Sequence, residues 1–283
     1  MDEHDGPWHD RMYNNRALVP EFAQHLQRWG EDSLRARSTL RCTLDVAYGD
    51  DASERLDIFP AGGASAPVLV FLHGGYWRAL DKKDHSFVAQ AFVEQGACVV
   101  VPNYALCPAV TVPHITLQMA RAVAWTWRNV ARFGGDPSRI TVAGHSAGGQ
   151  LGAMMLACLW QQLDPALPRQ VVRNALAISA LHDLEPIMRT PFLQGDLRLT
   201  PQQVAMASPA HLPAPVGGTL YSVCGGDESA EYLRQNALIR QAWGSVRVPV
   251  CEALPGLNHF SVLDAFVQPG HRLHALGLEL LRA

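Results

Sequence analysis

The sequence predicts an α/β fold with a mostly parallel central sheet and helices on both of its faces. Short apolar runs bounded by turn residues recur along the chain, and amphipathic helical stretches separate them. Glycine-rich turns directly follow two of these runs. Strands that alternate with helices in this way form parallel sheets with right-handed crossovers.

The expected strands are short and largely apolar. Leu44–Val46 and Glu54–Phe59 are predicted to form an antiparallel pair around the turn at Gly49. Later runs are apolar at consecutive positions, as in strands that a parallel sheet buries on both faces. These runs are Pro67–Leu72, Ala97–Val101, Ile140–Ala143, Ala175–Ser179, Thr219–Val223 and Val246–Cys251.

Helices are expected between these strands. Apolar residues in Leu117–Phe133 recur at every third or fourth position, which places them on one helical face, and Gly134 ends the helix. The other expected helices are Glu21–Trp29, Gly148–Leu163, Ala230–Trp243 and Leu273–Leu281.

The chain is expected to form one domain over residues 1–283, with residues 1–40 as an N-terminal extension. Residues 184–213 are rich in proline and contain no clear strand. We expect them to form a small cap insertion over the carboxyl-terminal edge of the sheet. Ligands bind at that edge in open α/β folds.

Composition argues against several classes of partner. The formal net charge of −3 provides no basic face for nucleic acid. No apolar run approaches the length of about 18 residues that indicates a membrane helix, and the acidic start Met1–Asp5 does not resemble a secretory signal. The six cysteines are scattered, so we expect them to be reduced, as in a cytoplasmic protein. A small-molecule substrate is the expected partner, and homodimer formation is left open.

The strongest motif is Gly144-His145-Ser146-Ala147-Gly148, which fits G-x-S-x-G. It follows an apolar strand and opens a helix rich in small residues, the context in which this pattern holds a nucleophilic serine. The sharp turn requires small residues on both sides of Ser146. We expect His145, beside the nucleophile, to pack or to orient its neighbours.

A second motif, His73-Gly74-Gly75-Tyr76-Trp77, follows an earlier buried strand. Adjacent glycines let backbone N–H groups turn toward a site. We expect the N–H groups of Gly75, Tyr76 and Ala147 to form an oxyanion hole, with Gly74 making the turn.

His259 follows the last expected strand, where a general base belongs in the chain order Ser, acid, His. The acid has three candidates. Glu228 is favoured, Asp227 would need a turn one residue shorter, and Asp183 follows the preceding strand.

No metal and no cofactor are expected. His271 and His274 lie three residues apart near the last helix, but no cysteine or carboxylate arrangement supports a metal site there. We expect both side chains to lie on a solvated helix face.

These motifs resemble those of the kynurenine formamidase (arylformamidase) branch of the α/β-hydrolases. Three further segments share this resemblance: Asn103–Pro108, Asn258-His259-Phe260 and Glu228–Tyr232. The resemblance extends from about Tyr13 to the C-terminus. It implies an α/β-hydrolase fold with Ser146, Glu228 and His259 as a catalytic triad and His73–Trp77 as the oxyanion motif. Animal members carry Asp where Glu228 stands, which leaves Asp227 open as the acid.

Three functions follow from the sequence. The first is a serine hydrolase that cleaves N-formyl-L-kynurenine to L-kynurenine and formate. The second is a carboxylesterase or aryl amidase of broad specificity, because the pocket rather than the triad decides the substrate. The third is a catalytically inactive scaffold that binds ligands. Tyr76 and Trp77 are candidate walls for an aromatic substrate, with plain core packing as the alternative reading.

Overall fold

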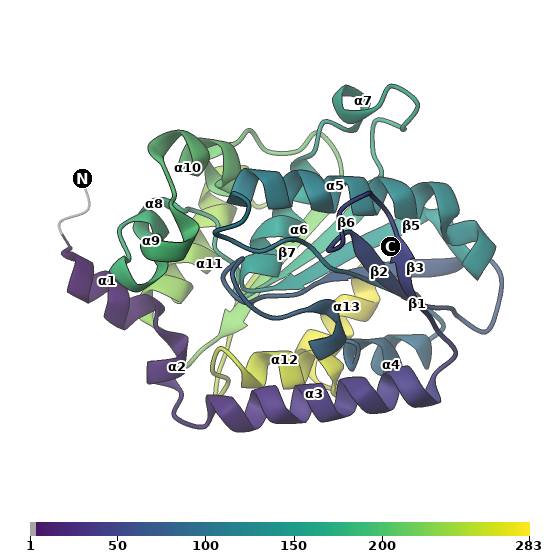
Figure 1. Ribbon diagram of the computed structural model, residues 1–283, viewed down its shortest axis with the longest axis horizontal. Helices are drawn as coiled ribbons and strands as arrows, with labels where there is room; N and C mark the ends of the chain where they lie inside the picture. The colour runs from purple at the N-terminus through teal and green to yellow at the C-terminus, as the bar shows by residue number, and fades with distance from the viewer. Residues whose placement is uncertain (1–3) are drawn as a thin grey trace.

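The computed structural model describes residues 4–283. Its strands form a single sheet in the order β1-β2-β4-β3-β5-β6-β7-β8 (Figure 1). From β4 to β8 all neighbours are parallel, whereas β2 runs antiparallel to both β1 and β4. The strands are β1 (Thr43–Ala47), β2 (Arg55–Phe59), β3 (Ala66–Leu72), β4 (Cys98–Pro102), β5 (Gly135–His145), β6 (Val172–Ile178), β7 (Thr219–Gly225) and β8 (Val250–Leu254).

The predicted fold class and the antiparallel start of the sheet are confirmed. The prediction was wrong for the start of the last strand, which begins at Val250 and not at Val246. The chain first turns at Gly244, whose carbonyl accepts the N–H groups of Arg247 and Val248. Val246 lies in this turn and is 84% exposed.

Helices cover both faces of the sheet. One face holds α5 (Val112–Asn129), α6 (Ala147–Ala157) and α11 (Ala230–Trp243), and the other holds α4 (Val88–Val93), α12 (Ser261–Val267) and α13 (Arg272–Arg282) (Figure 1). Side chains alternate between two cores along β3: Val68 and Val70 face the first layer, and Leu69 and Phe71 face the second. The site is therefore built on a sheet that is buried on both sides.

The N-terminal segment contacts both layers. Helices α1 (Gly6–Tyr13) and α2 (Asn15–Leu18) lie beside α11, and α3 (Phe22–Thr39) runs under the opposite face (Figure 1). Helix α3 has 18 residues, twice the length expected from Glu21–Trp29. Its buried residues, which include Trp29 and Ala36, continue the apolar stripe beyond the predicted end.

Residues 184–213 form short helices between β6 and β7: α8 (Glu185–Met188), α9 (Pro191–Leu197), α10 (Pro201–Ala207) and the 3₁₀ turn Pro209–His211. Each of these helices has proline in its first turn. Proline fits there because its missing N–H would have no helical acceptor. The prolines thus start helices, and α8 and α9 lie against α1, whereas α10 contacts α5 (Figure 1). The remaining short helices are α7 (Trp160–Leu163) and the 3₁₀ turns Lys82–Asp84 and Val130–Phe133.

All six cysteines are free thiols, three of them buried and three half-buried. Among residues 4–283, no helix combines the length and the apolar character needed to cross a bilayer.

The expectation of a solvated helix face at His271 and His274 was wrong. His274 is 2% exposed, and its Nδ1 donates to the carbonyl of Phe266. His271 caps α13, where its side chain accepts the N–H of Leu273. The amphipathic helix turns position 274 toward the core and not toward water.

Candidate active site

Ser146 occupies the turn between β5 and α6, with φ +57° and ψ −120°. This strained conformation is held by tight packing around the turn. A Cβ atom on Gly144 would lie 2.1 Å from the carbonyl oxygen of Gly148, and one on Gly148 would lie 2.0 Å from that of Leu72. Glycine is therefore required at both positions, as the G-x-S-x-G motif predicts.

His259 and Glu228 lie side by side at the same edge of the sheet, after β8 and β7 respectively. His259 Nδ1 donates to Glu228 Oε2 over 2.7 Å, which leaves Nε2 of this imidazole as the free acceptor. The other carboxylate oxygen, Oε1, accepts the N–H of Gly225 at 2.7 Å and the hydroxyl of Ser179. The carboxylate side chain is 1% exposed, so these hydrogen bonds fix it in place.

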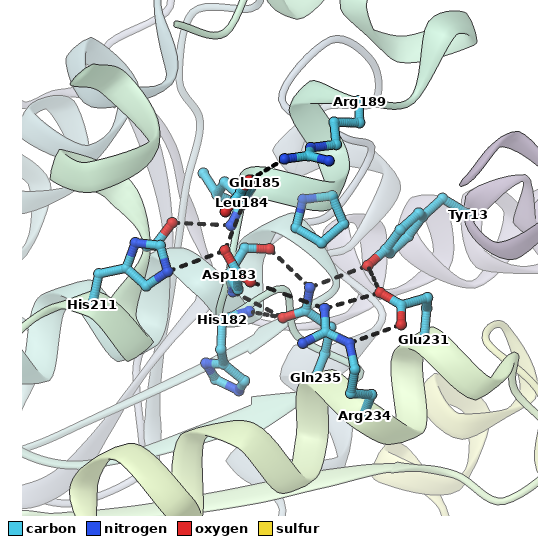
Figure 2. A network of polar contacts seen from close by, with 12 residues as sticks. Tyr13, His182, Asp183, Leu184, Glu185, Arg189, His211, Glu231, Arg234 and Gln235 are labelled. Atoms are coloured by element: carbon cyan, nitrogen blue, oxygen red, sulfur yellow. Dashed lines mark hydrogen bonds and ion pairs between the residues drawn. The ribbon is translucent and has the colours of Figure 1, made fainter. Parts of the chain in front are cut away.

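The other two candidate acids do not contact His259. Asp227 Oδ1 accepts the N–H of Gly256 at 3.4 Å. Asp183 pairs with His211 at 3.2 Å and lies 4.0 Å from Arg234, in the network of Figure 2. The structure therefore brings Glu228, and neither alternative, to the imidazole.

The glycine loop after β3 lies directly against the nucleophile. A Cβ atom on Gly74 would lie 2.9 Å from the carbonyl oxygen of His145 and 3.2 Å from Ser146 Cβ. The next three residues all have positive φ, with Gly75 at +104°. Within residues 4–283, the N–H groups of Gly75, Tyr76 and Ala147 donate to no protein acceptor. Ala147 begins α6, where helical N–H groups lack an intrahelical partner.

His73, the first residue of this motif, is fully buried and stacks on Tyr104 with ring centroids 4.1 Å apart. Burial lowers the pKa of its imidazole, which favours the neutral form. His73 Nε2 lies 3.2 Å from the Asn103 side chain. This ring anchors the start of the glycine loop.

A cavity of about 350 Å³ opens above Ser146 and His259. Its aromatic walls include Trp29, Phe192 and Phe260, and Tyr13 and Tyr76 also line it. Trp77, expected as a second aromatic wall, does not line the cavity: it is fully buried, and its indole N–H donates to Gln150 Oε1 over 3.1 Å. The positive φ at Trp77 turns its side chain into the core, so Trp77 has the alternative role of core packing.

A cluster of hydroxyl groups lies next to the nucleophile. The Tyr76 hydroxyl donates to the carbonyl of Tyr13 at 2.7 Å and lies 2.6 Å from the Tyr232 hydroxyl. Asn15 Nδ2 donates to both phenolic oxygens, at 2.9 Å to Tyr232 and 3.3 Å to Tyr76. Burial raises the pKa of both phenols, so they remain protonated.

Each phenolic hydroxyl has one proton, which sets the direction of the hydrogen bonds between Tyr76 and Tyr232. The only proton of the Tyr76 hydroxyl goes to Tyr13, so the Tyr232 hydroxyl must donate to Tyr76. The Ser146 side chain also acts to lower the pKa of Tyr232, which places the nucleophile near this hydroxyl. The ring centroid of Tyr232 is 4.6 Å from that of His259. Tyr232 thus packs against the catalytic imidazole.

The sequence did not identify Tyr232, Asn15 or Ser179 as residues of the site. Tyr232 could have been found, because it lies in the first turn of the helix that follows the acid. Asn15 could not, since nothing local connects α2 to the sheet edge.

His145 packs and orients, as expected. It is 4% exposed, and its Nε2 donates to the carbonyl of His259 at 2.8 Å. Burial and the neighbouring His259 hold the pKa of His145 well below its usual value. Among the described residues, no three His, Cys, Asp or Glu side chains are grouped as metal ligands.

Residues 69–220 match the family described as the alpha/beta hydrolase fold. The chain belongs to the α/β-hydrolases. The resemblance to kynurenine formamidases is also confirmed: this hydrolase is 28% identical to the kynurenine formamidase of Danio rerio over 265 residues, which cover 91% of this chain and 88% of the relative.

Two further relatives have other activities in their names. A putative thioesterase from Silicibacter sp. has a crystal structure with a TM-score of 0.84 and 30% identity, covering 97% of this hydrolase and 98% of that chain. Esterase LipQ of Mycobacterium tuberculosis is 40% identical over 131 residues, which cover 44% of this hydrolase and 30% of LipQ. The hydrolase is thus related to both formamidases and esterases.

Proposed function

We propose that this hydrolase is a serine enzyme that cleaves aryl formamides, with N-formyl-L-kynurenine as substrate and L-kynurenine and formate as products. One observation carries the proposal: Ser146 on its strained turn, the paired His259 and the free N–H groups of Gly75 and Tyr76 meet at one cavity. The similarity to kynurenine formamidases over nearly the whole chain supports the choice of substrate.

In the first half of the reaction, Ser146 Oγ attacks the formyl carbon while His259 Nε2 takes its proton. Glu228 holds the imidazole in the required tautomer and stabilises the imidazolium that forms. The N–H groups of Gly75, Tyr76 and Ala147 donate to the oxyanion. Each such donor contributes about 3–4 kcal/mol to transition-state stabilisation.

In the second half, the imidazolium donates its proton to the aniline nitrogen as the C–N bond breaks. The amine leaves, and Ser146 carries the formyl group as an ester. Water then attacks this ester with His259 as base, which releases formate and restores the serine.

The cavity suits such a substrate. A formyl group is the smallest acyl group, so it needs little space beside Ser146. The aryl ring needs apolar walls, which Trp29, Phe192 and Phe260 provide.

A second candidate is hydrolysis of small carboxylic esters. The 40% identity with LipQ over 131 residues favours it, because LipQ is named as an esterase. The same catalytic groups would serve both reactions, and only the cavity would discriminate between them.

Steady-state kinetics test the proposal. We expect kcat/KM for N-formyl-L-kynurenine to exceed that for p-nitrophenyl acetate, with formate and kynurenine released in equal amounts and activity abolished in Ser146→Ala. Turnover of the ester without turnover of the formamide would overturn the first function in favour of the second. Turnover of neither would favour the inactive scaffold.

A further inference from the structure

The active-site cavity is uncharged at its bottom and charged at its rim. Ser146 is 3% exposed and His259 5% exposed. The fully charged side chains that line the cavity, among residues 4–283, are Arg16, Arg78 and Asp196. A substrate that reacts at Ser146 must direct any charged end to this rim, because an unpaired charge is costly to bury.

The two guanidinium groups at the rim differ in their partners. Arg78 Nη1 donates to Asp196 Oδ2 at 2.7 Å and to the carbonyl of Phe192 at 2.8 Å, so its charge is compensated. No hydrogen bond or ion pair within the described chain engages the Arg16 guanidinium. The rim therefore has one positive charge without a counter-charge.

Arg16 is held in a defined place. Its Cζ lies 5.4 Å from the centroid of the Phe22 ring, a cation–π distance. The Phe22 ring contacts Phe260, with centroids 6.1 Å apart, and Phe260 follows His259 in the sequence. On the other side, the neighbouring Asn15 is fixed by its bonds to Tyr232 and Tyr76. Both connections tie the arginine to the catalytic residues.

We propose that Arg16 forms a subsite for the carboxylate of the substrate, and that it selects aryl formamides that bear an amino-acid side chain. One uncompensated positive charge matches a single carboxylate group, which a guanidinium binds through two parallel hydrogen bonds. This inference rests on the proposed function, because it assumes that the formamide lies at Ser146. It identifies the recognition group for the far end of that substrate.

The test compares two aryl formamides. N-formyl-L-kynurenine carries the carboxylate, and 2-formamidoacetophenone is the same aryl ketone without the amino-acid end. Arg16→Gln is expected to raise KM for the first about ten- to a hundredfold, as loss of a charged hydrogen bond does, with kcat nearly unchanged. The kinetics of the neutral compound should stay within about twofold. Arg16→Lys should recover part of the loss, since it restores the charge without the fork.

Arg11→Gln is the matched control, because Arg11 lies on α1, is exposed and does not line the cavity. Equal losses for both formamides in Arg16→Gln would show a structural role and overturn the subsite. Unchanged KM for formylkynurenine would overturn it as well.

A second substrate pair separates failure of the subsite from failure of the proposed function. If the wild-type protein cleaves neither formamide, phenyl acetate and 4-acetoxybenzoate make the same comparison with esters. A preference for the anionic ester that disappears in Arg16→Gln would retain the carboxylate subsite while the formamidase function fails. No such preference would overturn both.

Discussion

Two regions of the molecule meet at the cavity, and they are built in different ways. The carboxyl-terminal edge of the sheet supplies Ser146, Glu228 and His259 from turns after β5, β7 and β8. The N-terminal helices supply the facing wall, including Asn15 and Arg16 on α2. Local motifs at the strand ends thus supply the reactive groups. The N-terminal helices, which are distant in sequence, position these groups and face the substrate.

The N-terminal region is attached to the sheet edge through buried polar groups. Figure 2 shows Tyr13 directed at α11, where its hydroxyl donates to Glu231 Oε2 at 2.6 Å and accepts from Gln235 Nε2 at 3.2 Å. Glu231 is also bound by Arg234 through both of its oxygens. The helix that carries Tyr232 therefore also holds α1, so the two regions share one support.

The largest effects are expected at the sheet edge. Ser146→Ala and His259→Ala should each lower kcat by about 10⁴- to 10⁶-fold, because nucleophile and base act as one unit. The double variant should be no slower than either single variant. Steady-state assays at matched circular dichroism spectra check this, and additive losses would contradict a shared mechanism.

The acid gives the next largest effect. Glu228→Gln should lower kcat by about 10³- to 10⁴-fold, since the amide can favour the wrong imidazole tautomer. Asp227→Asn is the matched control one residue away, and it should keep kcat within about twofold because Asp227 does not reach His259. The opposite ranking would make Asp227 the acid.

Substitution of Tyr232, which connects α11 to the N-terminal helices, should lower activity less. Tyr232→Phe should lower kcat/KM about tenfold, or about 1–1.5 kcal/mol, because it removes the hydrogen bonds with Asn15 and Tyr76. The rate at which a fluorophosphonate labels Ser146 should fall in parallel, which loss of stability alone would not cause in folded protein. Tyr221→Phe is the control, because Tyr221 bonds Glu279 on the far side of the sheet. Equal losses in both variants would remove any role of Tyr232 in positioning.

The stability of the fold should fall at low pH, because two histidines are buried in their neutral form. Burial lowers the pKa of His85 and of His182 from 6.5 to about 3. Between these values the unfolded chain binds protons that the folded chain does not, so stability falls as the pH decreases below 6.5. Each histidine should contribute a slope of up to about 1.4 kcal/mol per pH unit. Urea unfolding measures this slope, and His182→Gln should reduce it by one proton; an unchanged slope would contradict neutral burial.

The sequence was sufficient for the sheet edge because the signals there are local. The turn around Ser146 needs glycines at fixed positions, and buried parallel strands are recognisable as short apolar runs. His259 could be predicted from its place after the last strand. The choice of Glu228 over Asp227 depended on the exact path of one loop, which only the fold defines.

The N-terminal wall could not be predicted in this way. Asn15 lies 217 residues from its partner Tyr232, so no spacing connects them. The choice between cavity wall and core packing for Trp77 depended on backbone dihedral angles within the glycine loop. The pairing of Arg78 with Asp196, and hence the unpaired state of Arg16, is likewise a tertiary property.

The role of Ser146 as a nucleophile activated by His259 is tested by the site and rate of fluorophosphonate labelling, measured by mass spectrometry of the digested protein. We expect a single adduct on Ser146 in the folded wild-type chain, with much slower labelling in His259→Ala. Labelling of another residue, or equal rates in the two proteins, would contradict a serine activated by the imidazole of His259.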